Sequence, residues 1–164
     1  MLQIKIAHAL KGFVVLEDEP MEKAFDRILR SITAPLSRPV EEVIDYCIEQ
    51  ERGISGCMDT GCVLADPDPA EGFSSELIVG LGVSQRGIRW RWGSGAPRYG
   101  YLNIPVHVVL VVLAVDFQSK MRTLRAISTI FRADSELWRS ILGATSLEQA
   151  ISVLSEFEES PIRM

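Results

Sequence analysis

Residues 104–116 constrain the fold more than any other part of the chain. They read Ile-Pro-Val-His-Val-Val-Leu-Val-Val-Leu-Ala-Val-Asp and consist almost entirely of β-branched and other aliphatic residues. Such a run is typical of a strand buried on both faces, in the middle of a sheet that helices cover. It is shorter than the roughly 20 apolar residues that a membrane helix needs. Pro105 cannot donate a ladder hydrogen bond, so we expect it at the start of this central strand.

Composition indicates one globular domain spanning residues 1–164. The chain is 47% hydrophobic and 24% charged, which is ordinary for a soluble protein. Its net charge of −5 disfavours nucleic acid and anionic membranes as general partners. The three cysteines are too few for a disulfide framework, and the first residues lack a signal peptide, which together favour the cytoplasm. Cys57 and Cys62 have no nearby histidine, so we expect neither a metal nor another cofactor.

The first half of the chain carries two helical patterns and several short strands. Apolar residues recur at the spacing of one helical face over residues 21–32 and again over residues 40–48. The second pattern leaves an acidic face that we expect in solvent, formed by Glu41, Glu42, Asp45, Glu49 and Glu51. Strands are expected at residues 13–16, 62–64 and 77–83.

Three helices should follow the central strand. The first has its apolar face at Met121, Leu124, Ile127 and Phe131, which we expect to pack on the sheet. Asp134 can cap the second helix. The third opens with a capping box from Ser146 to Gln149. Two helices, a set of strands and three more helices predict an α/β/α sandwich on a single mixed sheet.

Residues 86–101 combine arginine with aromatic side chains. The candidate binding residues are Arg86, Arg89, Trp90, Arg91, Trp92, Arg98 and Tyr99. One interpretation is a hairpin whose tryptophans cover the edge of the core while its arginines point to water. The other is a surface for a protein partner, a second copy of the chain, a phosphate-bearing ligand or stacked bases.

Residues 51–66 bring in a family resemblance. They read Glu-Arg-Gly-Ile-Ser-Gly-Cys-Met-Asp-Thr-Gly-Cys-Val-Leu-Ala-Asp. This segment resembles the active-site segment of the fructose–mannitol type enzyme IIA domain of the bacterial phosphotransferase system, a family that includes nitrogen-regulatory IIA-like proteins. In that family a serine, spaced glycines and an apolar triplet precede a Pro-His pair, and the histidine carries the phosphoryl group. Ser55, Gly61 and the triplet at residues 62–64 occupy matching places.

The resemblance extends over about residues 10–157. Pro105, Val106 and His107 are similar to the family's entry into its next strand, and the last three helical patterns are similar to its C-terminal helices. The resemblance therefore implies the mannitol-type IIA fold, in agreement with the α/β/α sandwich.

The chemistry of the site departs from the family. Asp66 stands where the family has its phosphorylated histidine, and Lys120 where some members place another histidine. Relay between histidines needs a neutral imidazole nitrogen as nucleophile, so we expect the ordinary relay to be lost. The resemblance implies a degenerate site of Asp66, Ser55, His107 and Lys120 with no catalytic residue. The resemblance, together with strand spacing, implies that Ser55 and His107 lie within about 10 Å of Asp66.

The function favoured by these observations is a regulatory or protein-binding module of bacterial cytoplasm. Its partner would be a regulatory protein or a phosphocarrier protein, and self-association stays open. One alternative is a working phosphocarrier of the sugar or nitrogen phosphotransferase system that uses His107 or Asp66, in which case the chain is a phosphotransferase. Another is a nucleotide or nucleic-acid binder that uses the Arg/Trp segment. His107 itself is either a core histidine satisfied by a neighbour or part of a site at the strand's end.

Overall fold

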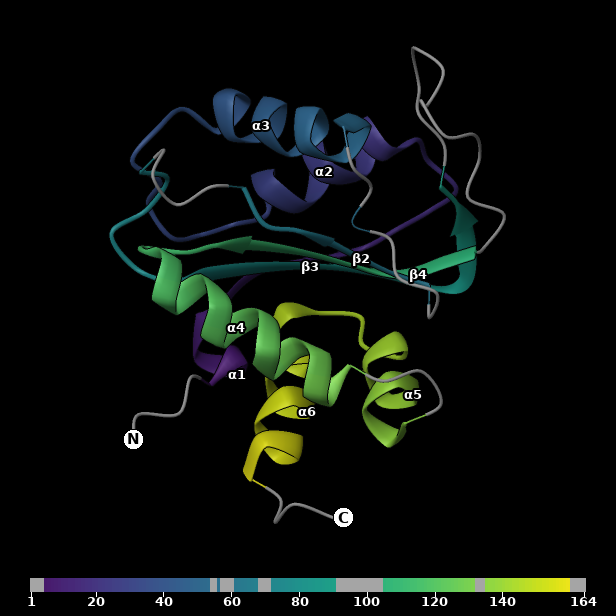
Figure 1. Cartoon of the computed structure of the whole chain (residues 1–164). Coiled ribbons are helices and arrows are strands. Elements are labelled where there is room, and N and C mark those ends of the chain that lie inside the picture. Colours follow the sequence, from purple (N-terminus) through teal and green to yellow (C-terminus); the bar gives the residue numbers. More distant parts are fainter. Residues whose placement is uncertain are drawn as a thin grey trace.

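One four-stranded mixed sheet separates two layers of helices (Figure 1). The computed structural model describes residues 5–53, 56, 61–67, 72–90, 105–131 and 135–159. The strands are β1 (Leu10–Val15), β2 (Cys62–Ala65), β3 (Ile78–Arg89) and β4 (Pro105–Leu113), in the spatial order β1-β3-β4-β2. β1 is parallel to β3, β3 is antiparallel to β4, and β2 is parallel to β4. The predicted α/β sandwich on one mixed sheet is confirmed.

β4 is the interior strand that the sequence predicts. It starts at Pro105 and has a neighbour on each side. Val108, Leu110 and Val112 join the core beneath the sheet, whereas Val109 and Val111 join the core above it. Because successive side chains point to opposite faces, a strand covered on both faces needs apolar residues at every position.

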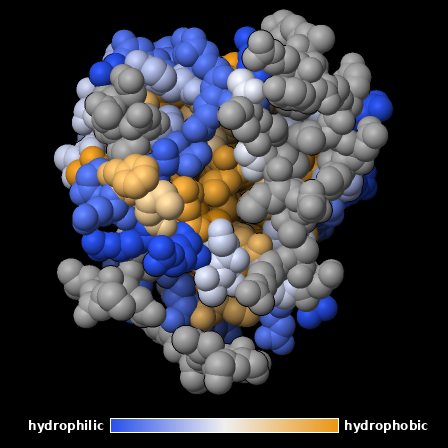
Figure 2. All heavy atoms as spheres, in the orientation of Figure 1, coloured by the Kyte–Doolittle hydropathy of each residue, from blue (hydrophilic) through white to orange (hydrophobic). Residues whose placement is uncertain are grey.

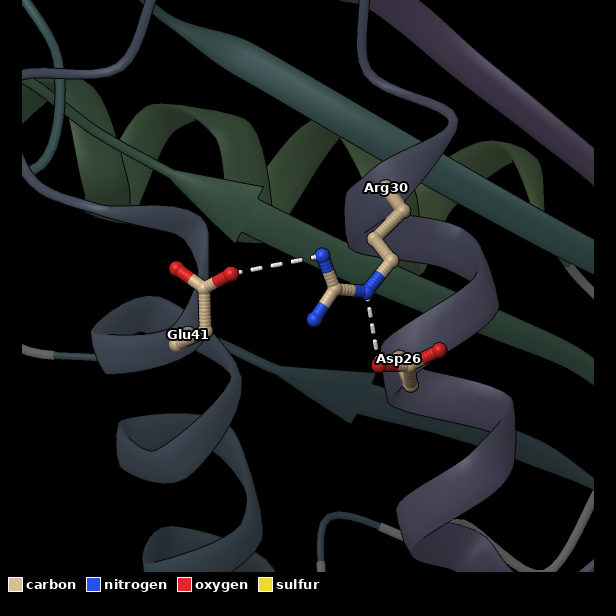
Figure 3. A network of polar contacts seen from close by, with 3 residues as sticks. All are labelled: Asp26, Arg30 and Glu41. Carbon is tan, nitrogen blue, oxygen red and sulfur yellow. Dashed lines mark hydrogen bonds and ion pairs between the residues drawn. The ribbon is translucent and has the colours of Figure 1, made fainter.

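The upper layer consists of α2 (Met21–Arg30) and α3 (Val40–Gly53) (Figure 1). Arg30 joins them on the surface, where its Nε donates to Asp26 Oδ1 at 2.8 Å and its Nη1 lies 3.4 Å from Glu41 Oε1 (Figure 3). The hydrogen bond with Asp26 is the largest of the effects that raise the pKa of Arg30 above its ordinary value. Exposed pairs of this kind contribute little to stability, so the two helices are held mainly by their apolar faces.

The lower layer consists of α1 (Ile6–Ala9), α4 (Phe117–Ile130), α5 (Glu136–Leu142) and α6 (Leu147–Glu159) (Figure 1). The sequence did not predict α1. The backbone N–H groups of Ile6 and Ala7 donate to the two carboxylate oxygens of Glu158, at 2.7 and 2.8 Å. This contact joins the beginning of the described chain to α6, on the side of the sheet that carries α1 and α6 (Figure 1).

Two helix starts differ in detail from the prediction. Ser135, and not Asp134, is the N-cap of α5, and its Oγ accepts from the N–H of Trp138. Ser146 Oγ accepts from the N–H of Gln149 at 3.2 Å, as the capping box predicts. The return contact differs, because Gln149 Oε1 accepts from the N–H of Thr145 at 2.8 Å.

The predicted sheet-facing row of α4 is wrong at Met121. The helix presents Thr123 and Ile127 to the core, whereas Met121 is 42% exposed. A helix turns by about 100° per residue, so Met121 lies far around the helix from Thr123. Phe131, which follows the helix, is buried as expected.

Candidate functional site

The carboxyl end of β2 brings three elements together. Asp66 directly follows β2, Gln50 lies in the last turns of α3, and Lys120 lies in the first turns of α4, which follows β4. The parallel pairing of β2 with β4 puts these strand ends at the same edge of the sheet. We call Asp66, Gln50 and Lys120 the Asp66 cluster.

Contacts at both the backbone and the side chain hold Asp66 in place. Its N–H donates to Gln50 Oε1 at 3.0 Å, and Gln50 Nε2 donates to the Asp66 carbonyl at 3.1 Å and to Oδ1 at 3.3 Å. Lys120 Nζ lies 3.6 Å from the other carboxylate oxygen, Oδ2. The side chains of Lys120 and Asp66 are only 15% and 24% exposed, respectively. The carboxylate is therefore paired with an ammonium group in partial isolation from water.

The start of α4 is also fixed by an aspartate. Asp116 is the N-cap, and its Oδ1 accepts from the N–H of Ser119 at 2.7 Å. That hydrogen bond to the backbone is the main reason why the pKa of Asp116 lies below its ordinary value. The cap fixes the first turn of α4, which carries Lys120 toward Asp66.

Glu51 is buried, so the predicted solvent exposure of this residue is wrong. It is 2% exposed, with Oε1 accepting from Trp90 Nε1 at 3.0 Å and Oε2 accepting from the N–H of Gly56 at 2.8 Å. The sequence contained a signal, because Glu51 lies four residues after the buried Cys47 and therefore on the same helical face.

Gly56 lies along the outer edge of β2. Its carbonyl accepts from the N–H of Leu64 at 3.1 Å. A Cβ at position 56 would come within 2.0 Å of the Leu64 carbonyl oxygen, so only glycine fits there. Glu51 and Gly56 thus connect the end of α3 to the strand that precedes Asp66.

Trp90 covers the core, as one of the two interpretations of the Arg/Trp segment predicts. It is fully buried and meets the ring of Phe25 edge-on, with ring centroids 5.8 Å apart. Its proposed role as an exposed binding residue is therefore wrong. Arg86 and Arg89 are exposed on β3. The remaining candidates of this segment, Arg91, Trp92, Arg98 and Tyr99, lie outside the described residues.

His107 and Asp66 lie at opposite ends of the β2–β4 pair. The N–H of His107 donates to the Gly61 carbonyl at 2.8 Å, and Ala65 is level with Val111. Gly61 and Asp66 are five steps apart along the strand, at about 3.3 Å per step, which corresponds to about 16 Å. The expected separation of about 10 Å is too short, because in parallel strands the beginning of one lies far from the end of the other. Ser55 lies outside the described residues.

The ring of His107 is held by its own neighbours. Nδ1 lies 2.8 Å from the Ser84 carbonyl oxygen, and because a carbonyl only accepts, this nitrogen carries the proton in that contact. On the other side, a Cβ at Gly87 would lie 3.1 Å from Nε2, so the ring packs directly against the Gly87 backbone. Gly87 has φ of 80°, a conformation that glycine tolerates best.

Other chemistry at the site is limited. Burial raises the pKa of the Cys47 thiol to about 12, and the charges of Asp66 and Glu51 act in the same direction.

Within the described ranges, no three His, Cys, Asp or Glu side chains are grouped so that they could hold a metal ion. The same part of the chain contains no helix that is both long enough and apolar enough to cross a membrane.

The α/β fold of the chain matches that of phosphotransferase system IIA domains. In particular, the chain is similar to the nitrogen regulatory protein IIA-Ntr from Neisseria meningitidis, with a TM-score of 0.66 and 14% identity over 91% of this chain and 98% of that chain. It is similar to the mannitol-specific cryptic phosphotransferase enzyme IIA CmtB from Escherichia coli, with a TM-score of 0.65 and 15% identity over 93% of this chain and 99% of that chain.

A third structure, IIA mannitol from Escherichia coli, gives a TM-score of 0.64 at 10% identity, over 93% of this chain and 99% of that chain. No protein-family model and no curated protein sequence matches the chain. At these identities the likeness is one of fold.

Proposed function

We propose that the chain is a IIA-like domain without the phosphorylated histidine, with Asp66 in its place, and that it works as a regulatory or protein-binding module. The observation that carries the proposal is the pairing of Asp66 with Lys120 at 3.6 Å. With Oδ1 near Gln50 Nε2 and Oδ2 near Lys120, both oxygens are engaged. A carboxylate held in this way is a poor nucleophile, because attack would have to break the ion pair in a partly buried place.

The consequence for signalling is a site whose charge does not alternate. In IIA domains with the phosphorylated histidine, a neutral histidine gains a doubly negative phosphoryl group and loses it again. Asp66 instead forms an ion pair with Lys120, and neither side chain takes up a phosphoryl group in this proposal. A partner that binds beside this site would therefore always meet the same charge on the protein, without a phosphorylated form.

The names of the similar structures support a protein partner. One is called a nitrogen regulatory protein, another a mannitol-specific cryptic phosphotransferase enzyme IIA, and the third IIA mannitol. By the same proposal, this chain would contact a regulatory protein or a phosphocarrier protein in bacterial cytoplasm.

The described geometry disfavours His107 as a substitute acceptor. Its Nδ1 is engaged by Ser84, and its Nε2 faces the backbone of Gly87. His107 is also about 16 Å along the strands from Asp66, so the two could not share one phosphoryl donor in a single pose.

The test is phosphoryl transfer from labelled phosphoenolpyruvate through the general phosphotransferase enzyme and its histidine phosphocarrier protein. A functional IIA domain serves as the positive control. We expect no label on this chain, and a measurable label on the double variant Asp66→His/Lys120→His, since it restores imidazoles at both places. Acid-labile, base-stable label on the unmodified chain that disappears in His107→Ala would instead identify a working phosphocarrier.

A further inference from the structure

The exposed face of α4 has an unusual composition for this acidic chain. From Phe117 to Ile130 the helix contains three basic residues and no acidic one, although the whole chain has a net charge of −5. Lys120 is already paired with Asp66. Arg122 and Arg125 are exposed, and no ion pair joins either guanidinium to a carboxylate of the described residues.

Large apolar side chains lie on the same face. Phe117 is 67% exposed and Met121 is 42% exposed. They are four residues apart, so they are neighbours on the helix, and Arg125 continues the row by one more turn. Figure 2 shows hydrophobic residues in the middle of the visible face, at the level of the sheet and the start of α4.

We propose that this face of α4 binds an acidic segment of a partner protein that also carries large apolar side chains. The binding face consists of Phe117, Met121, Arg122 and Arg125. This inference rests on the proposed function, because it names the chemistry of the partner that a regulatory IIA-like module would bind. Carboxylates of the partner would pair with the two arginines, and apolar side chains would cover Phe117 and Met121.

A protein fits this face better than a membrane or a nucleic acid. Phe, Met and Arg are enriched at protein interfaces, whereas Lys and the acidic residues are depleted there. Recognition of anionic lipid typically uses clusters of about 4–8 basic residues. Two arginines on a chain of net charge −5 fall short of that, and the same charge opposes binding to phosphate backbones.

The test places a photoreactive benzophenone amino acid at Gln118, an exposed position of α4. This replacement removes the 3.4 Å contact from Arg122 Nη2 to Gln118 Oε1, but it keeps the four side chains of the binding face. A second form carries it at Asp45, which is exposed on α3 in the opposite layer. After irradiation of the cells that make the protein, mass spectrometry reads the sequence of each cross-linked peptide. We expect the Gln118 form to capture one peptide with excess acidic residues and at least one large apolar residue.

Variants decide whether the captured peptide depends on the binding face. Arg122→Glu/Arg125→Glu and, separately, Phe117→Ala/Met121→Ala should each lower the cross-linked yield by about tenfold, equivalent to about 1.4 kcal/mol. Lys23→Glu/Arg139→Glu makes the same change in net charge at exposed sites elsewhere and should leave the yield unchanged. Circular dichroism checks that all three variants are folded.

Four results would overturn the inference. They are a captured peptide with excess basic residues, a peptide of this chain itself, a lipid or nucleic-acid adduct, and no capture at Gln118. If the Asp45 form captures a protein while the Gln118 form does not, the chain is a binding module that uses a different face, and only the inference fails. If the phosphoryl-transfer assay labels the unmodified chain, the proposed function fails independently of any cross-link.

Discussion

Glu51 is a carboxylate that joins three separate parts of the chain. It belongs to α3, it accepts from the Trp90 indole at the end of β3, and it accepts from the Gly56 backbone beside β2. A buried tryptophan needs an acceptor for its N–H, and a buried carboxylate needs donors. Each group therefore satisfies the hydrogen-bonding requirement of the other. The contacts of Glu51 also hold the end of α3 near β2, the strand that precedes Asp66.

Removal of this carboxylate should destabilise the fold. Glu51→Ala leaves the buried N–H of Trp90 and the half-buried N–H of Gly56 without this acceptor, at a cost of about 2–4 kcal/mol, while Glu51→Gln keeps one acceptor and should cost less. Urea unfolding measures the difference. A double-mutant cycle with Trp90→Phe should show coupling, and purely additive effects would contradict the importance of the hydrogen bond.

Cys47 should make stability depend on alkaline pH. Burial favours the neutral thiol, so the folded protein keeps this proton up to a pKa of about 12, compared with 9.0 for an ordinary cysteine. The folded state therefore binds more protons than the unfolded state between these values. The resulting stability is complete below pH 9 and falls by about 1.4 kcal/mol per pH unit above it.

The measurement for Cys47 is the free energy of unfolding at several pH values just above 9, compared with Cys47→Ala. Lysines and tyrosines titrate in both proteins, so their effect cancels in the difference. The advantage of the unmodified protein over the variant should shrink as pH rises, and a constant difference would show that the thiol is not shielded.

Single residues were the hardest part to predict from sequence. Helical spacing gave the faces of α2 and α3 correctly, but it treats every acidic residue as a surface residue, and so it missed Glu51. Whether a carboxylate can be buried depends on donors that come from distant segments, here residues 56 and 90. The spacing from Cys47 indicates the face on which Glu51 lies, but it does not reveal these donors.

Among the elements, β4 has the largest consequence for stability. Leu110 is fully buried, with Leu64 beside it in β2 and Leu81 beside it in β3. Leu110→Ala should lower the free energy of unfolding by about 2–5 kcal/mol. Thermal or urea unfolding tests this, with Val115→Ala as control because Val115 is 45% exposed beyond the strand. Equal effects of the two substitutions would contradict an interior β4.

Elements with a clear apolar pattern were predictable, including the four-residue strand β2, whereas α1 was not. The continuous apolar run identified β4, and the spacing of apolar residues identified α2, α3 and α6. α1 has only four residues, and its N–H groups depend on Glu158 at the far end of the chain. For α4, the sequence pattern marked the helix but not its orientation, because Met121 and Leu124 also fit an apolar row that the sheet does not use.

At the scale of the whole molecule, the sequence predicted the layers but not the distance between the site residues. The resemblance to IIA domains implied that Asp66, His107 and Lys120 belong together. The parallel register of β2 and β4 joins Asp66 with Lys120 and separates both from the His107 end of the strands. Register is a property of two strands together, so one strand's sequence does not specify it.

The edge position of β2 has a consequence for motion. β2 has four residues and one strand neighbour, whereas β4 is held from both sides. Short edge elements open locally at a lower free-energy cost than interior strands. Native-state hydrogen exchange should therefore release the amides of β2 sooner than those of Val109 and Val111. Equal protection would contradict this. Opening of β2 would also draw Asp66 away from Lys120, so the ion pair would come and go while the rest of the sheet stays closed.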